Sequence, residues 1–409
     1  MNQFDVIIAG GGAAGFFAAI QIAENNPELQ IVILEKGKEV LSKVRISGGG
    51  RCNVTHAEFS PDLLAGYYPR GEKELIGPFH KFCSGDTMAF FEERGVPLKI
   101  EADGRIFPQS DSSTSIISCF LDCCHALGIK IITSCGVQSF NKPDKNWLLE
   151  TTCGKFEAPD LMICTGSSNK TWKLLSSLGH SIVSPVPSLF TFNCKDPRIN
   201  GLMGLSSEVS IDIPGSSLQA YGPLLITHWG FSGPAILRLS AWGARELHER
   251  NYEFRIRISW TQNMDAEDVF TELLELKKQH PKQRPANSRI GAIPKRLYLS
   301  LLEYCDLHQI ERWADASNKQ IRKLADELTG GTFAIKGKST FKEEFVTAGG
   351  VDLKEVDMRT FESKLHDRLY FAGEVLNIDA ITGGFNFQNA WTGAFIAART
   401  ILDKRQVNS

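Results

Sequence analysis

Apolar residues along the chain fall into two patterns. Short, continuous apolar runs at Val6–Ala9, Ile31–Leu34, Leu161–Cys164 and Leu369–Ala372 predict buried strands. The first of these runs leads into a predicted helix at Phe16–Ala23. Buried strands that alternate with helices indicate an α/β fold built on a parallel sheet.

Beyond about Pro185 the pattern changes to short segments of alternating apolar and polar residues, separated by Gly, Pro and Asn. This alternation predicts an antiparallel sheet or small barrel. A helix is expected from about Ala235 to Glu249, and apolar spacing predicts further helices from Asp265 to Leu328. The alternating segments are residues 189–193, 207–213, 218–221, 224–227 and 252–259.

The first strand enters a glycine-rich turn. Gly10, Gly12 and Gly15 have the spacing G-x-G-x-x-G between a predicted strand and a predicted helix, which is the dinucleotide-binding fingerprint. Gly10 would permit the turn, Gly12 would let a pyrophosphate approach the backbone, and Gly15 would let helix and strand pack closely. Glu35 ends the next strand, twenty residues beyond Gly15, where a carboxylate can accept hydrogen bonds from ribose hydroxyls. The motif predicts a bound adenine dinucleotide.

A second glycine-rich segment, Gly48–Gly50, consists of three successive glycines. Glycine supplies no side chain for packing and costs backbone entropy, so such a run is expected where the backbone closely approaches a ligand. Arg51 follows, and its guanidinium can either bind a phosphate or hold the loop through a carboxylate. The segment therefore predicts a second cofactor contact.

Near the C-terminus, the strand Leu369–Ala372 ends in Gly373 and Glu374, and Gly383-Gly384 precede a helix expected at Phe387–Leu402. A glycine pair at a helix start would be costly without a ligand. The acid can bind the ribityl chain of a flavin, and the positive helix end can stabilise negative charge on the reduced ring. FAD is therefore favoured over NAD as the resident cofactor.

Composition and net charge limit the kinds of binding partner and the cellular location that we expect for this chain. The 409 residues suggest two or three domains, and a net charge of −2 gives no general attraction to nucleic acid or to an anionic membrane. No apolar run approaches the roughly 18–20 residues needed to span a bilayer, and the N-terminus lacks a basic leader, so a cytoplasmic protein is expected. The ten cysteines are then expected to be thiols. Lys277–Arg296, with seven basic residues and no acid, is expected to be a solvated loop.

Candidate acid–base residues near the cofactor are His228, Tyr221 and Cys52. His228 lies at the exit of a predicted strand, where an imidazole can exchange a proton with substrate, and a structural histidine bonded to backbone is the alternative. Cys52 also fits a small residue packed against the cofactor. Arg105, beside the expected hairpin turn Asp103-Gly104, either faces a substrate or pairs across the hairpin. No Ser-His-Asp or metal-ligand spacing stands out, so no metal is expected.

Together these motifs resemble one family, the bacterial YhiN-like (aminoacetone oxidase, BaiN-like) FAD-dependent oxidoreductases. The resemblance spans essentially the full chain and is most specific at SGGGRCN and TGGFNFQ. It implies a Rossmann-like, two-dinucleotide-binding-type FAD domain formed by both chain ends, with an inserted β-barrel-like subdomain that carries a small helical subdomain. The matching segments are DVIIAGGGAAG at 5–15, KVRISGGGRCNVTH at 43–56, GRIFPQS at 104–110, THWGFSGPAIL at 227–237, VTAGGV at 346–351 and LYFAGEVLNIDAITGGFNFQNAWTGA at 369–394.

The expected parts are an FAD domain at 1–188 and 344–409, a barrel-like subdomain at 189–262 and 331–343, and a helical subdomain at 263–330. The resemblance implies that FAD is held mainly by the glycine-rich segments of both chain ends. The expected FAD contacts are Gly10, Gly12, Ala13, Ala14, Gly15, Glu35, Lys36, Gly48, Gly49, Gly50, Arg51, Cys52, Asn53, Val137, Thr165, Gly166, Gly373, Glu374, Gly383, Gly384, Phe385 and Asn386.

The chain departs from the family in two places. Relatives usually continue Thr165-Gly166 with a second glycine and a longer segment, whereas Ser167–Trp172 is shorter here, and His56 replaces the commoner Asn. The first departure leaves the substrate and nicotinamide contacts near the flavin open.

The expected function is an FAD-dependent oxidoreductase in which a small organic substrate is oxidised or reduced at the flavin. No second G-x-G-x-x-G follows a predicted strand, so either NAD(P)H visits the flavin transiently or oxygen accepts the electrons. A flavin-binding sensor without turnover and an FAD enzyme acting on tRNA are the alternatives. The sequence leaves the substrate, the electron donor and the oligomeric state open.

Overall fold

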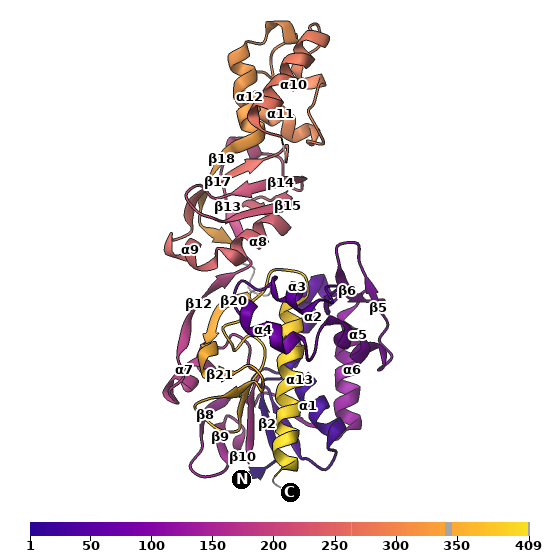
Figure 1. Ribbon diagram of the computed structural model, residues 1–409, viewed down its shortest axis with the longest axis vertical. Coiled ribbons are helices and arrows are strands. Elements are labelled where there is room, and N and C mark those ends of the chain that lie inside the picture. Colours follow the sequence, from indigo (N-terminus) through magenta and orange to yellow (C-terminus); the bar gives the residue numbers. More distant parts are fainter. Residues whose placement is uncertain (263, 340–345, 408–409) are drawn as a thin grey trace. The chain divides into compact units, whose positions relative to one another are not determined.

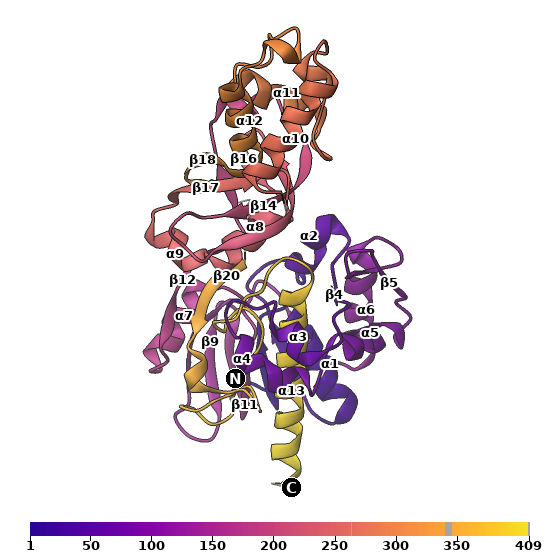
Figure 2. The ribbon, with the colours of Figure 1, turned by 45° about the horizontal axis from the view of Figure 1, so that its top comes forward.

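The computed structural model describes residues 1–262, 264–339 and 346–407 (Figures 1 and 2). The chain divides into two compact units, Met1–Pro187 with Lys342–Ser409, and Ser188–Phe341. The boundary expected between residues 343 and 344 lies outside the described residues, and the remaining domain boundaries stay a prediction. None of the helices formed by the described residues combines the length and apolar character that a membrane crossing requires.

The first unit is built on a seven-stranded sheet. Its strands are β2 (Val6–Ala9), β3 (Ile31–Leu34), β7 (Lys130–Ile132), β11 (Asp160–Ile163), β21 (Val356–Asp357), β22 (Glu362–Ser363) and β23 (Leu369–Phe371). Their order is β21-β22-β23-β11-β2-β3-β7, and β23, β11, β2, β3 and β7 run parallel. The parallel sheet predicted from the apolar runs is therefore confirmed, and both chain ends contribute strands to it.

Three long helices lie together beside this sheet in both ribbon views (Figures 1 and 2). They are α1 (Ala13–Asn25), α6 (Ser113–Ala126) and α13 (Phe385–Gln406), and α1 packs against the other two. Helix α6 is capped by Ser112, whose hydroxyl accepts a hydrogen bond from the Thr114 N–H. The shorter helices are α2 (Ser42–Gly50), α3 (Pro61–Ala65), α4 (Glu72–Phe79), α5 (Ser84–Glu92) and α7 (Asn169–Ser177).

Smaller sheets complete the first unit. The hairpin predicted around Asp103-Gly104 is confirmed as the antiparallel pair β5 (Leu98–Ile100) and β6 (Arg105–Pro108). A four-stranded sheet has the order β1 (Asn2–Gln3), β10 (Gly154–Ala158), β9 (Trp147–Thr151) and β8 (Val137–Asn141). The remaining strands are β4 (Thr55–His56), which pairs with β6, and the pair β12 (Ile182–Ser188) and β20 (Val346–Val351).

The second unit contains the antiparallel strands predicted from the alternating segments. They are β13 (Thr191–Asn193), β14 (Ser206–Asp212), β15 (Gln219–Ile226), β16 (Gly230–Ser232), β17 (Glu253–Ser259), β18 (Gly331–Lys336) and β19 (Lys338–Ser339), in the sheet order β18-β17-β14-β15-β16-β13-β19. Only Gly337, with a φ of 92°, separates β18 from β19, so one bent segment forms both edges and the sheet curls. Within the described residues, β18 pairs with β17 and β19 pairs with β13, so this bent segment is hydrogen-bonded to strands near both ends of the sheet order.

The helices of the second unit are α8 (Pro234–Trp242), α9 (Ala244–Glu249), α10 (Ala266–Gln279), α11 (Lys295–Tyr304) and α12 (Asn318–Gly330). The prediction of a single helix at 235–249 is wrong, because Gly243 separates this segment into the two helices α8 and α9. The two strands expected at 218–221 and 224–227 are one continuous strand, β15. The helices expected at 265–328 are present, and the basic stretch Lys277–Arg296 mostly forms the connection between α10 and α11.

Candidate functional site

The glycine turn after β2 contains two glycines that packing requires and one that packing does not. Gly10 has a φ of 117°, and a side chain there would overlap the carbonyl group of Cys164. A side chain at Gly15 would overlap the carbonyl oxygen of Gly10, which is why α1 can approach β2 so closely. At Gly12 nothing lies within 4 Å of the position that a Cβ would take. Gly12 therefore leaves open space at the N-terminus of α1, where free N–H groups and the helix dipole favour an anion.

Glu35 is fixed at the end of β3. Its two carboxylate oxygens accept hydrogen bonds from the backbone N–H groups of Gly11 at 2.8 Å and Gly37 at 2.7 Å. A carboxylate oxygen can accept more than one hydrogen bond, so Glu35 retains capacity for ribose hydroxyls. The fixed negative charge also disfavours a 2′-phosphate at this position.

A cavity of about 460 Å³ adjoins this turn. Thr165 contributes to its lining, and the Thr165 Oγ1 atom is buried without a hydrogen-bond partner in the described part of the chain. Because a buried hydroxyl is rarely left unpaired, a ligand that hydrogen-bonds Thr165 would stabilise the site. The cavity is lined by Ala9, Gly10, Leu34, Glu35, Lys36, Ser134, Cys135, Gly136, Val137, Thr152, Thr165, Ser168, Lys170 and Thr171.

One side of this cavity was predictable from the sequence, and most of the other side was not. Gly10, Glu35, Lys36, Val137 and Thr165 were expected, and Ala9 and Leu34 end predicted strands, whereas the other lining residues belong to no motif. One signal was available, because residues 134–136 follow the parallel strand β7. The carboxyl ends of parallel strands meet at the same edge of a sheet, so this segment was bound to lie near Glu35.

The glycine triplet forms a left-handed turn within α2, with φ values of 58°, 69° and 85° at Gly48–Gly50. A Cβ at Gly48 would lie 2.9 Å from the ring of Phe107, whereas the last two glycines have nothing within 4 Å. Arg51 holds this loop: its guanidinium binds Glu101 at 2.6 Å and stacks on Phe107, 3.9 Å from the ring centroid. Of the two roles open for Arg51, the contacts are those of a residue that holds the loop through a carboxylate.

The two residues after Arg51 are buried against this loop. Burial raises the pKa of the Cys52 thiol to about 12, so Cys52 stays protonated near neutral pH. A thiol that stays protonated does not suit a general base, which must lose its proton near the operating pH. Asn53 has a buried Oδ1 atom without a hydrogen-bond partner among the described residues.

The N-terminus of α13 lies directly on this loop. Gly384 has a φ of 94°, and a Cβ there would lie 2.6 Å from the backbone of Thr55 and 2.8 Å from Asn53 Oδ1. Phe385, the first residue of α13, stacks on Tyr67 with ring centroids 4.3 Å apart. The start of α13 thus packs closely on residues 53–55, beside an unpaired amide oxygen.

Glu374 and Asn386 complete this end of the site in different ways. The Glu374 carboxylate pairs with Lys43 and lies 3.5 Å from the position of a Cβ on Gly166. The Asn386 amide exchanges two hydrogen bonds with the backbone of Ala380, at 3.0 and 3.2 Å. The Asn386 side chain is thus used to close the loop before α13, which leaves its backbone as the part available to a ligand.

These features fit FAD. The cavity beside Glu35 suits the adenosine end, the open helix terminus at Gly12 suits the pyrophosphate, and the uncovered backbone at Gly49 and Gly50 suits a flat ring. The unpaired oxygens of Thr165 and Asn53 supply polar groups at both ends of such a ligand.

Three further candidates have definite positions. His228 is exposed in the turn between β15 and β16, and Tyr221 is 52% exposed on β15. Both residues belong to the second unit. Arg105 binds Glu101 at 3.0 Å and Asp103 at 2.7 Å. Arg105 therefore takes the second of its two expected roles and pairs within the hairpin.

A buried Ser-His-Glu arrangement was not visible in the sequence spacing. His180 Nδ1 lies 3.0 Å from Glu355, and its Nε2 lies 3.0 Å from Ser363 Oγ. The Ser363 hydroxyl also accepts hydrogen bonds from the backbone N–H groups of Leu365 and His366. All hydrogen-bonding capacity of the hydroxyl is engaged, so the arrangement is structural. Burial, the largest effect, lowers the pKa of His180 despite the contact with Glu355.

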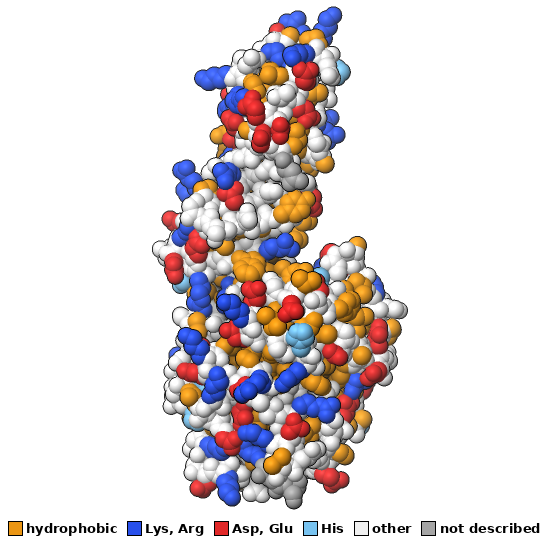
Figure 3. Space-filling view, in the orientation of Figure 1, with side chains coloured by type: hydrophobic (Ala, Val, Ile, Leu, Met, Phe, Trp, Pro, Cys, Tyr) orange, Lys and Arg blue, Asp and Glu red, His pale blue; other side chains and the backbone are white. Residues whose placement is uncertain are grey.

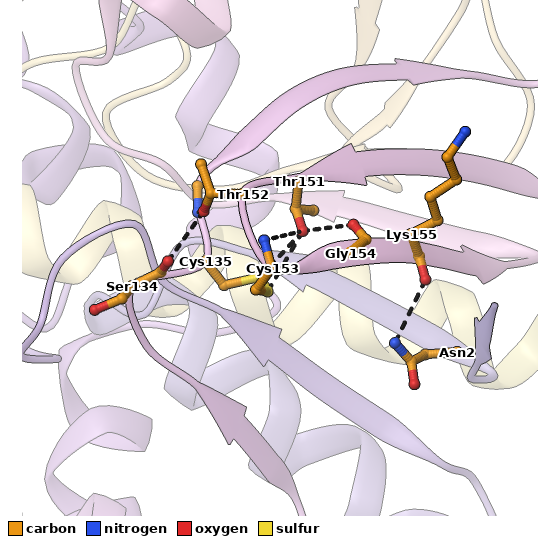
Figure 4. Close-up of a disulfide and its surroundings, with 9 residues drawn as sticks. Asn2, Ser134, Cys135, Thr151, Thr152, Cys153, Gly154 and Lys155 are labelled. Atoms are coloured by element: carbon orange, nitrogen blue, oxygen red, sulfur yellow. Dashed lines mark hydrogen bonds between the residues drawn. A yellow bond between two sulfur atoms is a disulfide. The ribbon is translucent and has the colours of Figure 1, made fainter.

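The expectation that all ten cysteines are thiols is wrong for two of them. Cys135 and Cys153 form a disulfide, with Cα atoms 5.3 Å apart (Figure 4). The antiparallel strands β8 and β9 lie between the two cysteines in the chain and fold back on each other. Residues that are 18 positions apart therefore become neighbours, and their spacing gave no sign of it.

Comparison with known proteins gives one family and several full-length relatives. Residues 4–400 match the model of the HI0933-like protein Rossmann domain. A ribosomal RNA dihydrouridine synthase of Haemophilus influenzae is 28% identical, covering 98% of this chain and 99% of the relative. A 3-dehydro-bile acid delta(4,6)-reductase of Clostridium scindens is 27% identical, covering 99% of this chain and all of the relative.

Solved structures share the fold at lower identity. The 3-ketosteroid-Δ4-(5α)-dehydrogenase of Rhodococcus jostii superposes with a TM-score of 0.52 at 12% sequence identity. The superposition covers 97% of each chain. The Rossmann-like architecture assigned to this chain is therefore one that crystal structures already contain.

Proposed function

The chain belongs to the HI0933-like Rossmann-domain family and is an FAD-dependent oxidoreductase, and from this premise we propose that it reduces a carbon–carbon double bond conjugated to a carbonyl group. The substrate is a small organic molecule, and NAD(P)H is the transient electron donor. Family membership favours an enzyme over the flavin-binding sensor without turnover.

One observation carries this proposal. The two kinds of full-length relative act on different molecules, yet both names describe the same chemical change. A dihydrouridine differs from uridine by two hydrogens across a ring double bond beside a carbonyl. A 3-dehydro-bile acid delta(4,6)-reductase removes ring double bonds of a 3-oxo compound. Reduction of an activated double bond is the chemistry that these relatives have in common.

The residues of the first unit would hold and tune the cofactor for this reaction. Glu35 and Thr165 would bind the adenosine end, and Gly12 would admit the pyrophosphate to the N-terminus of α1. The N-terminus of α13 at Gly384 would stabilise negative charge on the ring, and Asn53 Oδ1 would accept a hydrogen bond. Bound FAD supplies the hydride chemistry, which the protein itself cannot perform.

Proton supply is the second requirement of such a reduction, because the hydride adds to one carbon and a proton to its neighbour. We assign this role to His228, whose imidazole is exposed to solvent and can pass a proton to a bound substrate. No second dinucleotide motif is present in the sequence, so NAD(P)H would reach the flavin without a nucleotide domain of its own.

A base in ribosomal RNA is the second candidate substrate. The observation that favours it is that relatives from Haemophilus influenzae and Escherichia coli both have names referring to ribosomal RNA. Lys and Arg side chains also gather at the end of the helical part (Figure 3). The net charge of −2 weighs against a polyanionic substrate, because nucleic-acid affinity rests mainly on phosphate contacts. If the substrate is a nucleic acid, ribosomal RNA is therefore a better candidate than the tRNA considered from the sequence. Ribosomal RNA still ranks below a small organic substrate.

The test is an anaerobic assay with two potential electron donors and matched acceptors. NADH or NADPH consumption is followed with a cyclic enone, with the corresponding saturated ketone as control, and with ribosomal RNA that lacks dihydrouridine. We expect consumption with the enone alone, and a product heavier by two hydrogens. Consumption that requires RNA would select the second candidate, and no consumption with any acceptor would refute the proposal.

A further inference from the structure

The Cys135–Cys153 disulfide lies in the wall of the cavity assigned to the adenosine end of FAD. Cys135 lines this cavity together with Gly136 and Val137, and Thr152, the neighbour of Cys153, lines it too. Figure 4 shows the bond connecting the segment before β8 to the turn between β9 and β10. Two separate stretches of cavity wall are thus joined covalently.

The same wall is connected to the ribose-binding acid. The Cys135 N–H donates to the carbonyl oxygen of Glu35 at 2.8 Å, and the Ser134 N–H donates to that of Gly37 at 2.7 Å. Ser134 adopts a φ of 54°, an unfavourable conformation for a residue with a side chain. A displacement of Cys135 would therefore be transmitted to the backbone that positions the Glu35 carboxylate.

The two sulfur atoms differ in access to reductants. Cys153 is exposed, whereas Cys135 is buried. A thiolate from solvent can therefore attack the Cys153 sulfur, and the Cys135 sulfur leaves with the electron pair and takes up a proton. A second thiolate then attacks the mixed disulfide, so two small thiols or one dithiol are oxidised while both cysteines are reduced.

Thr151 lies where it can form a hydrogen bond with a cysteine thiol once the disulfide is reduced. The Thr151 hydroxyl lies 3.3 Å from Cys135 Sγ and 3.4 Å from Cys153 Sγ. A Cys135 thiol can donate a hydrogen bond to this hydroxyl. The reduced Cys135 thiol therefore has a polar partner inside the cavity wall. The turn at Cys153, however, is no longer covalently joined to Cys135.

We propose that Cys135–Cys153 is a thiol–disulfide site that sets the affinity of the enzyme for FAD. The bond is formed in the high-affinity state, and reduction by a low-molecular-weight dithiol frees the turn that carries Thr152 and weakens cofactor binding. The inference rests on FAD as the occupant of the cavity, and it makes cofactor retention depend on the surrounding thiol–disulfide balance.

The experiment measures FAD affinity in both redox states of the full-length chain. Apoprotein is prepared oxidised and after reduction with dithiothreitol, excess reductant is removed under argon, and flavin fluorescence gives the FAD dissociation constant. Thiols titrated in denaturant should number eight before and ten after reduction, because eight cysteines are free and two are paired. We expect reduction to raise the dissociation constant about fivefold or more.

Variants separate the disulfide from other thiols. Cys135→Ser with Cys153→Ser should bind FAD like the reduced wild type and ignore dithiothreitol, whereas Cys123→Ser, in helix α6, should respond like the wild type. The wild-type comparison needs no substitution, so it decides the question even where the double variant fails to fold. Ten thiols before reduction, or a smaller change in affinity, would overturn the inference while leaving the proposed reaction untouched, because no substrate is used.

Discussion

Gly12 offers the sharpest test of the nucleotide site, because a methyl group there meets no protein atom. Gly12→Ala introduces a Cβ into space where nothing lies within 4 Å, at a φ of −98° that alanine adopts readily. In the folded protein without cofactor the substitution is therefore almost free of steric cost. In the complex the methyl group would occupy the space through which a pyrophosphate contacts the backbone N–H groups of α1.

The magnitudes separate these two effects. Loss of glycine at a helix N-cap costs up to about 1 kcal/mol, and the reduced entropy of the unfolded chain offsets about 0.4–1 kcal/mol of that cost. The apoprotein should therefore unfold within about 1 kcal/mol of the wild type. Displacing the phosphates should weaken FAD binding at least about tenfold, which corresponds to about 1.4 kcal/mol.

Gly15→Ala is the matched control in the same helix. Its Cβ would overlap the carbonyl oxygen of Gly10 and lie 3.3 Å from Ile8, so the substitution overpacks the contact between α1 and β2. Overpacking of this kind costs about 1–3 kcal/mol of stability. Thermal unfolding of both apoproteins should therefore show a lowered midpoint for Gly15→Ala alone.

The assay is FAD titration by flavin fluorescence, together with unfolding curves of the proteins with and without FAD. A Gly12→Ala protein that binds FAD with wild-type affinity would refute the placement of the pyrophosphate at this turn. A large loss of apoprotein stability in Gly12→Ala would refute the reasoning in another way, because it would mean that the space is needed for packing.

Three further predictions concern single groups. His180 is buried as the neutral form and its pKa is lowered, so the unfolded chain binds more protons than the folded one below about pH 6.5. The free energy of unfolding should accordingly fall as the pH drops through this range, and a His180→Gln variant that loses stability just as steeply would contradict this. Cys52→Ser should leave the pH profile of kcat unchanged, because the buried thiol does not titrate near neutral pH; a displaced profile would restore Cys52 to the chemistry. His228→Ala should retain stoichiometric FAD and lose turnover about tenfold or more, and unchanged kinetics would remove this imidazole from the proposed proton transfer.

The parts of the fold that depend on local pattern were predictable from sequence. The strand, glycine turn and helix at residues 6–25 follow from apolar runs and from G-x-G-x-x-G, and so does the strand that ends in Glu35. The hairpin at Asp103-Gly104 follows from its turn residues. A helix boundary was missed where a glycine interrupts the apolar pattern, because Gly243 divides a helix that apolar spacing alone would continue.

The parts of the site that depend on tertiary proximity were not predictable from spacing. Thr152 and Ser134 carry no motif, and they meet in the cavity wall because β8 and β9 fold back on each other. The disulfide has the same origin. The contact between Gly384 and Asn53 joins the two ends of the chain, and only the family resemblance suggested it. Arg51 had two chemically reasonable roles, and the position of Glu101 decided between them.

Rapid mixing of the reduced enzyme with a conjugated enone in the absence of oxygen is the decisive test of whether the flavin reduces an activated double bond. The protein is first reduced anaerobically by NADH or NADPH, and the visible absorbance of the flavin is followed after mixing with the enone or with its saturated analogue. We expect the absorbance to return with the enone, in a single turnover that forms one equivalent of saturated product, and to stay low with the analogue. Absorbance that stays low with every conjugated acceptor, including a uridine-containing ribosomal RNA, yet returns on admission of oxygen would contradict this expectation.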